Sequence, residues 1–462
     1  MLEPQIFKSN DIRGVAWGPG AEWDAAGAHA LGRAFARAFG LSGKRYAIGR
    51  DMRRLGPELC RAFAAGAAAE GASALGVGLV STDQLWFVSG ATGLPGVQFT
   101  ASHNPGEYNG VKFCLPGAAP ITPELMAAVK DGALECDADG CRWQAGASAD
   151  DRGEADPPFA EEWDSLPDYA AKLHSLVDLD GLRRLKVVVD AGNGMAGLTT
   201  PAVLETLPID VVGLYTDLDG TFPNHPANPL DPANLVDAQE AVRRHRADLG
   251  LVFDGDADRC FIVDEAGEVV NPALVTALIA ERALAREPGA SVVVNTITSR
   301  AVREVVEANG GRVVVSPVGH THIKAAMAAH NAVFGGEHSA HYYFREFWYA
   351  DTGMLAALNV VSLLGRGAGP MSQLVARLPH YPQSGEINSR VADAACVKAQ
   401  IAQAFDGDVS WDDGVLVSGE GWWLSVRESN TEPLLRLNVE ADDTATMEAL
   451  RDKALSIIRE GE

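Results

Sequence analysis

The sequence predicts an α/β protein whose final segment, from residue 369 onward, forms a separate and smaller α+β domain. As far as about residue 365, short apolar runs of strand type alternate with alanine- and leucine-rich helical stretches, which is typical of parallel α/β units. Beyond that point, three closely spaced strand-like runs precede apolar residues at helical spacing. The length of 462 residues corresponds to three or four domains at roughly 150 residues per domain.

The strands predicted for the first part lie, in chain order, at 46–49, 96–100, 186–190, 249–253, 291–296 and 312–315. Those predicted for the last part lie at 415–417, 422–426 and 434–439, before a helix that contains Met447, Leu450, Ala454, Ile457 and Ile458. Several of the first strands end in Gly, Asn, Asp or Ser. Because open α/β sheets bind ligands at the carboxyl ends of their strands, we expect the functional residues in those loops.

Three changes of character predict the domain boundaries. The segment 137–168 is rich in Asp, Gly, Pro and Ala without periodicity, so it is interpreted as a linker with a boundary near residue 150. The second boundary falls near 266, and the third lies where Gly365–Pro370 breaks the alternation. The expected domains are therefore 1–150, 151–266, 267–368 and 369–462.

Composition restricts the partners and the compartment. The 38 basic and 62 acidic residues give 38 − 62 = −24, a net charge that disfavours nucleic acids and acidic membrane surfaces. Any phosphate must therefore meet a local cationic pocket. The six cysteines are scattered and predict free thiols. Neither a signal peptide nor an apolar run of the ~18 residues that a span requires is visible, so we expect a cytoplasmic protein without a membrane partner.

An acidic loop between two predicted strands contains Asp254, Asp256 and Asp258. Carboxylates at alternate positions of a tight loop can converge on one hard divalent cation, and oxygen ligands favour Mg²⁺. The alternative is a polar turn whose aspartates cap backbone amides. An EF-hand is excluded, although Glu265 stands at its twelfth position, because Arg259 replaces the required glycine and the flanks are strand-like.

A serine-containing loop, 100–105, follows the strand predicted at 96–100. Ser102 at this junction would present its hydroxyl at the rim of the sheet as a nucleophile or phosphate carrier, or it would only bond its own turn. The G-x-S-x-G pattern of a hydrolase elbow is missing around it. Downstream, Asn109 and Gly110 predict a turn into a short strand that returns Lys112 to the same rim; the alternative for Lys112 is a solvated surface charge.

A glycine-rich segment, 335–341, follows an apolar run. If the strand continues, alternation aims Glu337, Ser339 and His341 in one direction, and a carboxylate, a hydroxyl and an imidazole suit a polyol. The alternative is a glycine turn with incidental polar residues. Metal binding by His338 and His341 is the weaker interpretation, because these two would face opposite sides of a strand.

The fourth motif is the loop at 427–433. It contains Arg427, Ser429, Asn430 and Thr431, whose guanidinium, hydroxyl and amide groups are those that a dianionic phosphate monoester requires. The alternative is an ordinary hairpin loop in which Ser429 and Thr431 have turn or capping roles.

Taken together and in this order, the four motifs resemble those of the α-D-phosphohexomutase family, and most closely its phosphomannomutase/phosphoglucomutase branch. TASHNP, DGDADR, GEHSAH and RESNTEP fall one in each expected domain, and the resemblance covers almost the whole chain. It implies a fold of four domains around a central cleft: three α/β domains with mixed sheets and a smaller carboxy-terminal α+β domain.

The resemblance also implies roles for individual residues. The catalytic group would consist of the phosphoserine and its cationic or proton-transferring neighbours: Ser102, His103, Lys112, Arg259, Arg13 and His320. The metal ligands would be Asp254, Asp256, Asp258 and Ser102. The residues that bind the sugar and its phosphate would be Glu337, Ser339, His341, Arg427, Ser429, Asn430 and Thr431.

The chain departs from the family pattern at three places. Asn10 stands where this branch often has tyrosine, and Ala340 replaces a common glycine in the sugar loop. Around Ile297–Ser299 the lysine of the relatives is missing, and Arg300 is the nearest cation. The loop that ends in His341 is more similar to mannose/glucose enzymes than to glucose-only relatives.

The activity implied by the resemblance is reversible transfer of a phosphoryl group between the 1- and 6-positions of mannose or glucose phosphates. It would proceed through a phosphoserine and a hexose 1,6-bisphosphate, which also serves as activator, and would use Mg²⁺. We expect a monomer whose partners are small phosphosugars. Alternatives are phosphoglucosamine mutase, a magnesium-dependent sugar phosphatase and a non-catalytic sugar-phosphate-binding protein.

Overall fold

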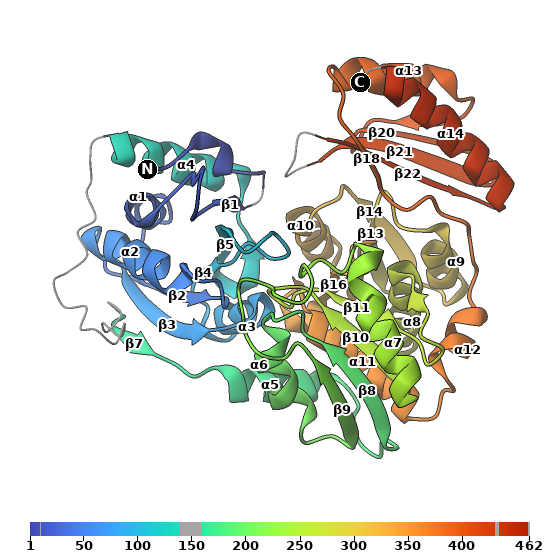
Figure 1. Cartoon of the computed structure of the whole chain (residues 1–462), viewed down its shortest axis with the longest axis horizontal. Helices are drawn as coiled ribbons and strands as arrows, with labels where there is room; N and C mark the ends of the chain where they lie inside the picture. The colour runs from blue at the N-terminus through green and yellow to red at the C-terminus, as the bar shows by residue number, and fades with distance from the viewer. Residues whose placement is uncertain (10, 139–158, 430–433, 461–462) are drawn as a thin grey trace. The chain divides into compact units, whose positions relative to one another are not determined.

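The computed structural model describes residues 1–9, 11–138, 159–429 and 434–460. The chain forms two compact units, and each unit joins segments that are distant in sequence. Unit 1 consists of Met1–Val270 and Ser339–Leu374, and unit 2 consists of Asn271–His338 and Val375–Glu462. Figure 1 labels the helices and strands.

The first sheet of unit 1 has the strand order β1-β5-β4-β2-β3-β7, with β6 beside β5. The strands are β1 (Ile12–Val15), β2 (Arg45–Arg50), β3 (Ser73–Leu79), β4 (Gly96–Phe99), β5 (Tyr108–Leu115), β6 (Ala119–Pro120) and β7 (Glu161–Glu162). β2 pairs in parallel with β3 and β4, whereas β5 is antiparallel to β1 and β4. The strands predicted at 46–49 and 96–100 are confirmed as β2 and β4.

Helices and short 3-10 turns accompany this sheet: η1 (Pro4–Ile6), α1 (Ala25–Ala38), α2 (Gly56–Ala69), α3 (Thr82–Thr92), η2 (Pro116–Ala118) and α4 (Pro123–Ala138). α1 packs against both α2 and α4. A β-carbon on Gly32 of α1 would lie 2.0 Å from the carbonyl oxygen of Phe63, and one on Gly66 of α2 would lie 2.0 Å from that of His29. The two helices can therefore approach this closely only because glycine stands at both crossing positions.

The second sheet of unit 1 has the order β12-β11-β10-β8-β9. Its strands are β8 (Leu185–Asp190), β9 (Ile209–Leu214), β10 (Leu249–Phe253), β11 (Cys260–Val263) and β12 (Val269–Val270). The helices are α5 (Leu166–Leu176), α6 (Ala196–Leu204), η3 (Pro232–Leu235) and α7 (Val236–His245). Strands β8, β9 and β10 are parallel, and β10 and β11 form an antiparallel hairpin. The predicted strands at 186–190 and 249–253 are confirmed.

Unit 1 also contains a later part of the chain: β16 (Tyr342–Phe344), η4 (Arg345–Phe347), β17 (Ala350–Asp351) and α11 (Gly353–Gly365). β16 and β17 are antiparallel. α11 packs against β11, and the hydroxyl of Thr352 caps the first turn of α11 by accepting from the amide of Leu355 at 3.2 Å. These contacts bring the segment after residue 339 beside the acidic-loop hairpin.

Unit 2 begins with parallel strands that pair in the order β14-β13-β15. The elements are α8 (Pro272–Arg286), β13 (Ser291–Asn295), α9 (Arg300–Ala308), β14 (Arg312–Ser316), α10 (His320–His330) and β15 (Phe334–Gly336). The strands predicted at 291–296 and 312–315 are confirmed as β13 and β14. α12 (Met371–Ala376) spans the junction at which unit 1 gives way to unit 2.

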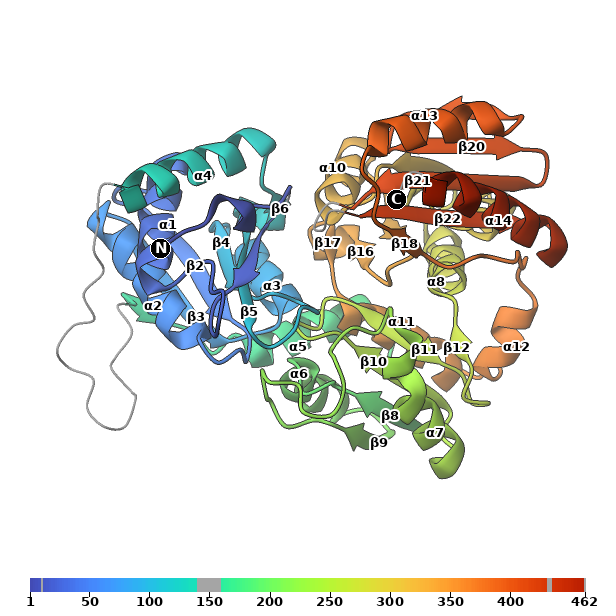
Figure 2. The same cartoon turned by 45° about the horizontal axis from the view of Figure 1, so that its top comes forward.

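The last part of unit 2 is an antiparallel sheet of order β18-β22-β21-β20-β19, with α13 (Ala394–Ala404) and α14 (Thr444–Glu460) packed side by side on it. The strands are β18 (Ile387–Ser389), β19 (Asp408–Ser410), β20 (Val415–Gly419), β21 (Trp422–Glu428) and β22 (Leu435–Ala441). Figure 2 shows both helices with this sheet. Apolar side chains of both helices and of the strands form one buried cluster. The three predicted strands and the terminal helix are confirmed.

Two expectations from composition can be compared with the described residues. Cys60, Cys260 and Cys396 are free thiols, as predicted, Cys114 and Cys136 are in no disulfide, and Cys141 lies outside the described residues. In the described part of the chain, no helix combines the length and the apolar character that crossing a membrane demands.

We predict that Gly66→Ala destabilises the protein, because the new methyl group would collide with the backbone of α1 and push the helices apart. Overpacking of this kind costs about 1–3 kcal/mol. Thermal unfolding followed by circular dichroism should show a lower midpoint for this variant. Gly56→Ala on the same helix is the control, since its β-carbon would lie 3.5 Å from the nearest atom. Equal midpoints for the two variants would contradict the prediction.

Candidate active site

The acidic loop joins β10 to β11, and the pairing of Phe253 with Cys260 closes it. The side chains of Asp254, Asp256 and Asp258 are all buried, and each offers a carboxylate oxygen within 4.8 Å of the others. The convergence that the spacing predicts is therefore present. The strands on both sides also agree with the exclusion of an EF-hand.

Two cationic side chains, Lys112 and Arg259, bond some of the oxygens of these three carboxylates. Lys112 Nζ donates to Oδ2 of Asp256 at 2.8 Å and to Oδ2 of Asp258 at 2.6 Å. Arg259 pairs with Asp254, its NH2 lying 2.7 Å from Oδ2. Two cations thus pair with three buried carboxylates, and the His341 imidazole lies 3.5 Å from Oδ1 of Asp258.

Two buried oxygens in this cluster accept no hydrogen bond from the described residues: Oδ1 of Asp256 and Oδ1 of Asp258. A buried carboxylate oxygen without a donor is costly, because it has lost its water. A hard divalent cation would satisfy such oxygens. The residues present therefore fit a metal such as Mg²⁺.

The electrostatic environment differs among these groups. Burial raises the pKa of Asp254 to about 7, against the opposing effect of Arg259. Burial would also raise the pKa of Asp256, but the Lys112 ammonium and the Thr82 hydroxyl bring it below its usual value. Burial would lower the pKa of Lys112, but Asp256 and Asp258 raise it. Lys112 is thus held in its protonated form.

Ser102 lies against the acidic loop. Its side chain donates to Oδ2 of Asp254 at 2.8 Å and accepts from NH2 of Arg259 at 3.2 Å, although the residue is only 2% exposed. Its φ of 49° lies in the left-handed region, which costs a non-glycine residue about 1–2 kcal/mol. The side chain thus bonds the acidic loop as well as His103 of its own turn, so the alternative that Ser102 only bonds its own turn is wrong.

The structure corrects the expectation for the strand that carries Lys112. Asn109 and Gly110 lie inside β5, so the predicted turn is wrong. A β-carbon on Gly110 would lie 2.1 Å from the carbonyl oxygen of Ile12, so glycine permits β1 to pair here. Lys112 is 6% exposed, which also excludes a solvated surface charge. It reaches the acidic loop directly from a central strand.

Arg13 and His103 complete the group around Ser102. Arg13 pairs with Asp11 at 2.8 Å, and its NH1 donates to Oδ1 of Asn104 at 3.0 Å. His103 Nδ1 lies 3.3 Å from Ser102 Oγ and also contacts the Arg259 guanidinium. Burial, together with Arg259 and Arg13, holds the pKa of His103 well below its ordinary value. Its imidazole is therefore neutral near pH 7.

The segment predicted to bind the sugar does not continue as one strand. β15 ends at Gly336. The predicted common direction of Glu337, Ser339 and His341 required a strand through all three residues, so that prediction does not apply. Glu337 lies in unit 2, whereas Ser339 and His341 lie in unit 1. Between them, Ala340 has a φ of 63°, at the position where the resemblance expects glycine.

Each part of this segment has its own contacts. Oε2 of Glu337 accepts from Asn295 Nδ2 at 3.0 Å and from the Gly319 amide at 3.3 Å. Ser339 Oγ lies 2.9 Å from His341 Nδ1, and His341 Nε2 lies 3.5 Å from Asp258 Oδ1. His341 therefore belongs to the surroundings of the acidic loop.

A second cationic cluster lies in unit 2. Arg427, which is 2% exposed, donates from NH2 to Oε2 of Glu386 at 2.9 Å, and Arg436 pairs with Oε1 of Glu386 at 3.1 Å. Nε of Arg427 is buried without a hydrogen-bond partner among the described residues. Burial would raise the pKa of Glu386, but His338 and the two arginines lower it to about 2. Two guanidinium groups thus share one carboxylate.

Arg427 lies near the end of β21, at the hairpin that leads to β22. The amide of Ser429 donates to the carbonyl oxygen of Leu434 at 2.8 Å across this hairpin. The backbone of Ser429 therefore belongs to a hairpin, which both interpretations of this loop allow. Asn430 and Thr431 lie outside the described residues.

Two further residues singled out in the sequence also lie in unit 2. His320 is the first residue of α10 and follows Gly319, whose φ is 131°. Arg300 donates to Glu440 at 3.1 Å and to Asp442 at 2.9 Å, and its guanidinium lies 4.1 Å above the ring of Tyr381. Arg300 is thus engaged with the carboxy-terminal part. Asn10 lies outside the described residues.

The sequence reasoning missed a buried arginine that holds the serine loop. Arg53 is 1% exposed and pairs with Asp51 at 3.2 Å. Its two terminal nitrogens donate to backbone carbonyls of the loop, those of Ser102 (2.8 Å), Asn104 (2.6 Å), Pro105 (2.7 Å) and Tyr108 (2.9 Å). The available signal was the position of Asp51 and Arg53 directly after the strand predicted at 46–49.

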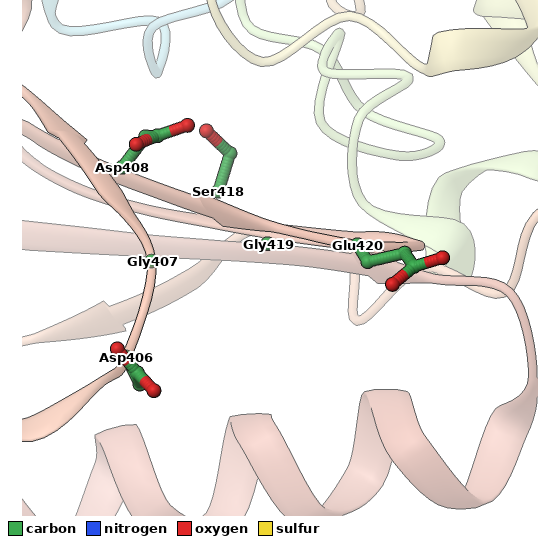
Figure 3. Close-up of a pocket in the computed structure, with 6 residues that line it drawn as sticks. All are labelled: Asp406, Gly407, Asp408, Ser418, Gly419 and Glu420. Carbon is green, nitrogen blue, oxygen red and sulfur yellow. The ribbon is translucent and has the colours of Figure 1, made fainter.

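A separate pocket lies beside β19 and β20 and is lined by Asp406, Gly407, Asp408, Ser418, Gly419 and Glu420. Figure 3 shows Asp408 and Ser418 pointing toward one another, with Asp406 and Glu420 apart from them. None of the six lining residues is cationic, and none is a predicted site residue. The pocket does not suit a phosphate.

Four family models match consecutive parts of the chain. They are described as phosphoglucomutase/phosphomannomutase alpha/beta/alpha domains I, II and III and the C-terminal domain, and they match residues 4–138, 167–267, 271–381 and 386–456. Three α/β domains and a smaller carboxy-terminal domain are thus confirmed. The matches define a phosphohexomutase scaffold.

Relatives and solved structures agree. The chain is 38% identical to phosphohexose mutases of Xanthomonas campestris pv. campestris, covering 90% of this chain and 91% of that one. It is 36% identical to a phosphomannomutase of Salmonella typhimurium, covering both chains completely. The structure of a phosphoglucomutase/phosphomannomutase family protein from Burkholderia thailandensis superposes with a TM-score of 0.86 at 31% identity, covering 100% of this chain and 99% of the other. The chain belongs to the phosphoglucomutase/phosphomannomutase family.

We predict that Arg53→Lys loosens the serine loop, because one ammonium cannot reach the four carbonyls that the guanidinium holds. Hydrogen bonds to charged groups contribute about 1.5–3 kcal/mol each, so amide exchange at residues 101–108 should become at least about ten-fold faster. Hydrogen-exchange mass spectrometry measures this. The control is Arg54→Lys, an exposed neighbour that stacks on Trp17. Unchanged exchange in Arg53→Lys would contradict the role of Arg53.

Proposed function

We propose that this chain is a hexose phosphate mutase that moves a phosphoryl group between the 1- and 6-positions of mannose or glucose phosphates through Ser102. The full-length match to the family supports an isomerase that acts on hexose phosphates. The observation that carries the role of Ser102 is its buried hydroxyl, bonded to Asp254 and to Arg259.

Mg²⁺ is the metal that the donor set suits, held by Asp254, Asp256 and Asp258 with the phosphorylated Ser102 as a further ligand. All of these donors are oxygens, and two of them are buried without a hydrogen-bond donor. When bound, Mg²⁺ offsets negative charge on the phosphoryl group that is transferred.

The side chains around Ser102 position and neutralise the phosphoryl group. Arg259 reaches Ser102 Oγ, and Arg13 reaches Asn104 of the same loop. On transfer, the bond from phosphorus to Ser102 Oγ breaks and a bond to a sugar hydroxyl forms, so the hydroxyl must give up a proton. Lys112 is a poor acceptor, because two carboxylates keep it protonated. His103 and His320 are the remaining candidates.

The other predicted residues bind the substrate. Glu337, Ser339 and His341 contact sugar hydroxyls, and Arg427, Ser429, Asn430 and Thr431 hold the phosphate that does not react. The buried Nε of Arg427 and the nearby Arg436 support a cationic site in this otherwise acidic chain. A hexose 1,6-bisphosphate serves as intermediate and activator. The protein acts as a cytoplasmic monomer with the domains 1–150, 151–266, 267–368 and 369–462.

We predict that Ser102→Ala abolishes isomerisation, because the variant has no oxygen to carry the phosphoryl group. The protein is incubated with Mg²⁺, a trace of hexose 1,6-bisphosphate and mannose 1-phosphate or glucose 1-phosphate. Formation of the 6-phosphate is then measured. Mass spectrometry of the wild type should find the peptide around residue 102 phosphorylated. Thr92→Ala, at the exposed end of α3, is the control for loss of a hydroxyl.

Other outcomes would overturn the proposal. Steady release of inorganic phosphate in place of the 6-phosphate would identify a phosphatase. Full mutase activity of Ser102→Ala would remove Ser102 from the reaction. Faster turnover of glucosamine 1-phosphate than of both hexose phosphates would point to phosphoglucosamine mutase.

We predict that Arg427→Ala raises KM for the sugar phosphate roughly ten- to a hundred-fold while leaving Ser102 phosphorylation intact. The reason is the loss of charge-assisted hydrogen bonds of about 1.5–3 kcal/mol each to the phosphate. Steady-state kinetics measures KM, and intact mass measures phosphorylation. Arg377→Ala, a half-exposed arginine of unit 2 paired with Glu281, is the control. An unchanged KM would remove Arg427 from the phosphate site.

A further inference from the structure

The first turn of α3 lies directly against the acidic loop. The amide of Thr82 donates to the carbonyl oxygen of Asp256 at 3.0 Å, and Thr82 Oγ1 donates to Oδ2 of the same residue at 2.6 Å. Thr82 is fully buried. One residue of α3 therefore holds both the backbone and the side chain of the central aspartate.

These bonds make the two oxygens of Asp256 inequivalent. Oδ2 accepts from both Thr82 and Lys112, whereas Oδ1 is buried and accepts no hydrogen bond from the described residues. Rotating the carboxylate would break two short bonds, one of them charge-assisted. The pair of donors thus fixes which oxygen remains available to a cation.

The turn that carries Thr82 is itself anchored on several sides. Asp83 accepts from Tyr169 of α5 at 2.6 Å and from Thr352, the cap of α11, also at 2.6 Å. Ser81 also donates to Asp83, and its Oγ accepts from the Gln84 amide at 3.2 Å. Thr82 therefore acts from a rigid support that joins three helices of unit 1.

We propose that Thr82 is a positioning residue for the metal, which orients Asp256 so that Oδ1 faces the cation. This inference rests on the proposed function only in requiring that the acidic loop binds a divalent cation. Removing the hydroxyl would leave Lys112 as the single donor on Oδ2. The Asp256 carboxylate could then rotate. Metal binding would have to fix its orientation, and the cost of that ordering would weaken the affinity for the cation.

The test is direct metal binding to the full chain. Mn²⁺, used as the probe for Mg²⁺, is titrated into the metal-free protein, and free Mn²⁺ is followed by electron paramagnetic resonance. Thr82→Val keeps the shape without the donor, whereas Thr82→Ser keeps the donor. We expect Mn²⁺ binding to weaken about ten-fold in Thr82→Val, the loss of one hydrogen bond to a charged group, and to change less than about two-fold in Thr82→Ser.

Two controls separate this role from a merely structural one. Thr92→Val replaces a hydroxyl at the opposite, exposed end of α3 and should bind Mn²⁺ as the wild type does. Mg²⁺ should also raise the melting temperature of the wild type and of Thr82→Ser more than that of Thr82→Val. If Thr82→Val does not fold, Thr82→Cys, whose thiol is only a weak donor, replaces it with the same expectation of weakened binding.

The outcomes distinguish the positioning role of Thr82 from the assignment of the acidic loop as a metal site. Wild-type affinity in Thr82→Val or Thr82→Cys would overturn the positioning role while leaving the metal site intact. Failure of the wild type itself to bind Mn²⁺ at the acidic loop would overturn the metal assignment of the proposed function. Equal weakening in Thr82→Val and Thr82→Ser would show that the hydroxyl is not the cause and would also overturn the role.

Discussion

The site is organised around three buried carboxylates in one loop. Asp254, Asp256 and Asp258 are withdrawn from water and pair with Lys112 and Arg259, while His341 lies beside Asp258. Buried carboxylates are tolerated only when charges or donors compensate them. Neighbouring elements supply the compensating groups: β5 carries Lys112, and the first turn of α3 carries Thr82. Oδ1 of Asp256 and Oδ1 of Asp258 accept no hydrogen bond from the described residues and are available to a cation.

The backbone of the serine loop beside these carboxylates is also held in place. Ser102 adopts a left-handed conformation, and Arg53 holds the carbonyls that follow it. Gly255 of the acidic loop also lies close, since a β-carbon there would be 2.5 Å from the carbonyl oxygen of Ser102. A serine held in this way keeps its hydroxyl directed at the carboxylates, which is the positioning that the proposed phosphoryl transfer requires.

The proposed phosphate site in unit 2 is built from arginines. Arg427 and Arg436 share the single carboxylate of Glu386. In a chain with a formal net charge of −24, a cationic cluster must be local to attract a phosphate. Under the proposed function, the acidic loop would bind the cation and this cluster would bind the phosphate.

Much of this could be predicted from residue order alone. Short apolar runs placed the strands, because strands covered on both faces, such as β10 and β13, are buried at every position. The three aspartates were found because their spacing is local. Two local predictions were wrong: the residues predicted as a turn, Asn109 and Gly110, lie within β5, and the strand expected to continue through Glu337 ends at Gly336.

The tertiary structure alone decided which distant groups meet. Lys112 lies 144 residues from Asp256, and Thr82 lies 174 residues from it, so no local pattern could pair them. The sequence does not distinguish Arg53 from other charged residues that follow strands, because its four carbonyl partners come together only in the folded chain. Sequence by itself determined the elements and the chemical groups, because periodicity and loop spacing are short-range. Which oxygen of Asp256 is left for a cation follows from hydrogen bonds that form only when the sheets and α3 pack together.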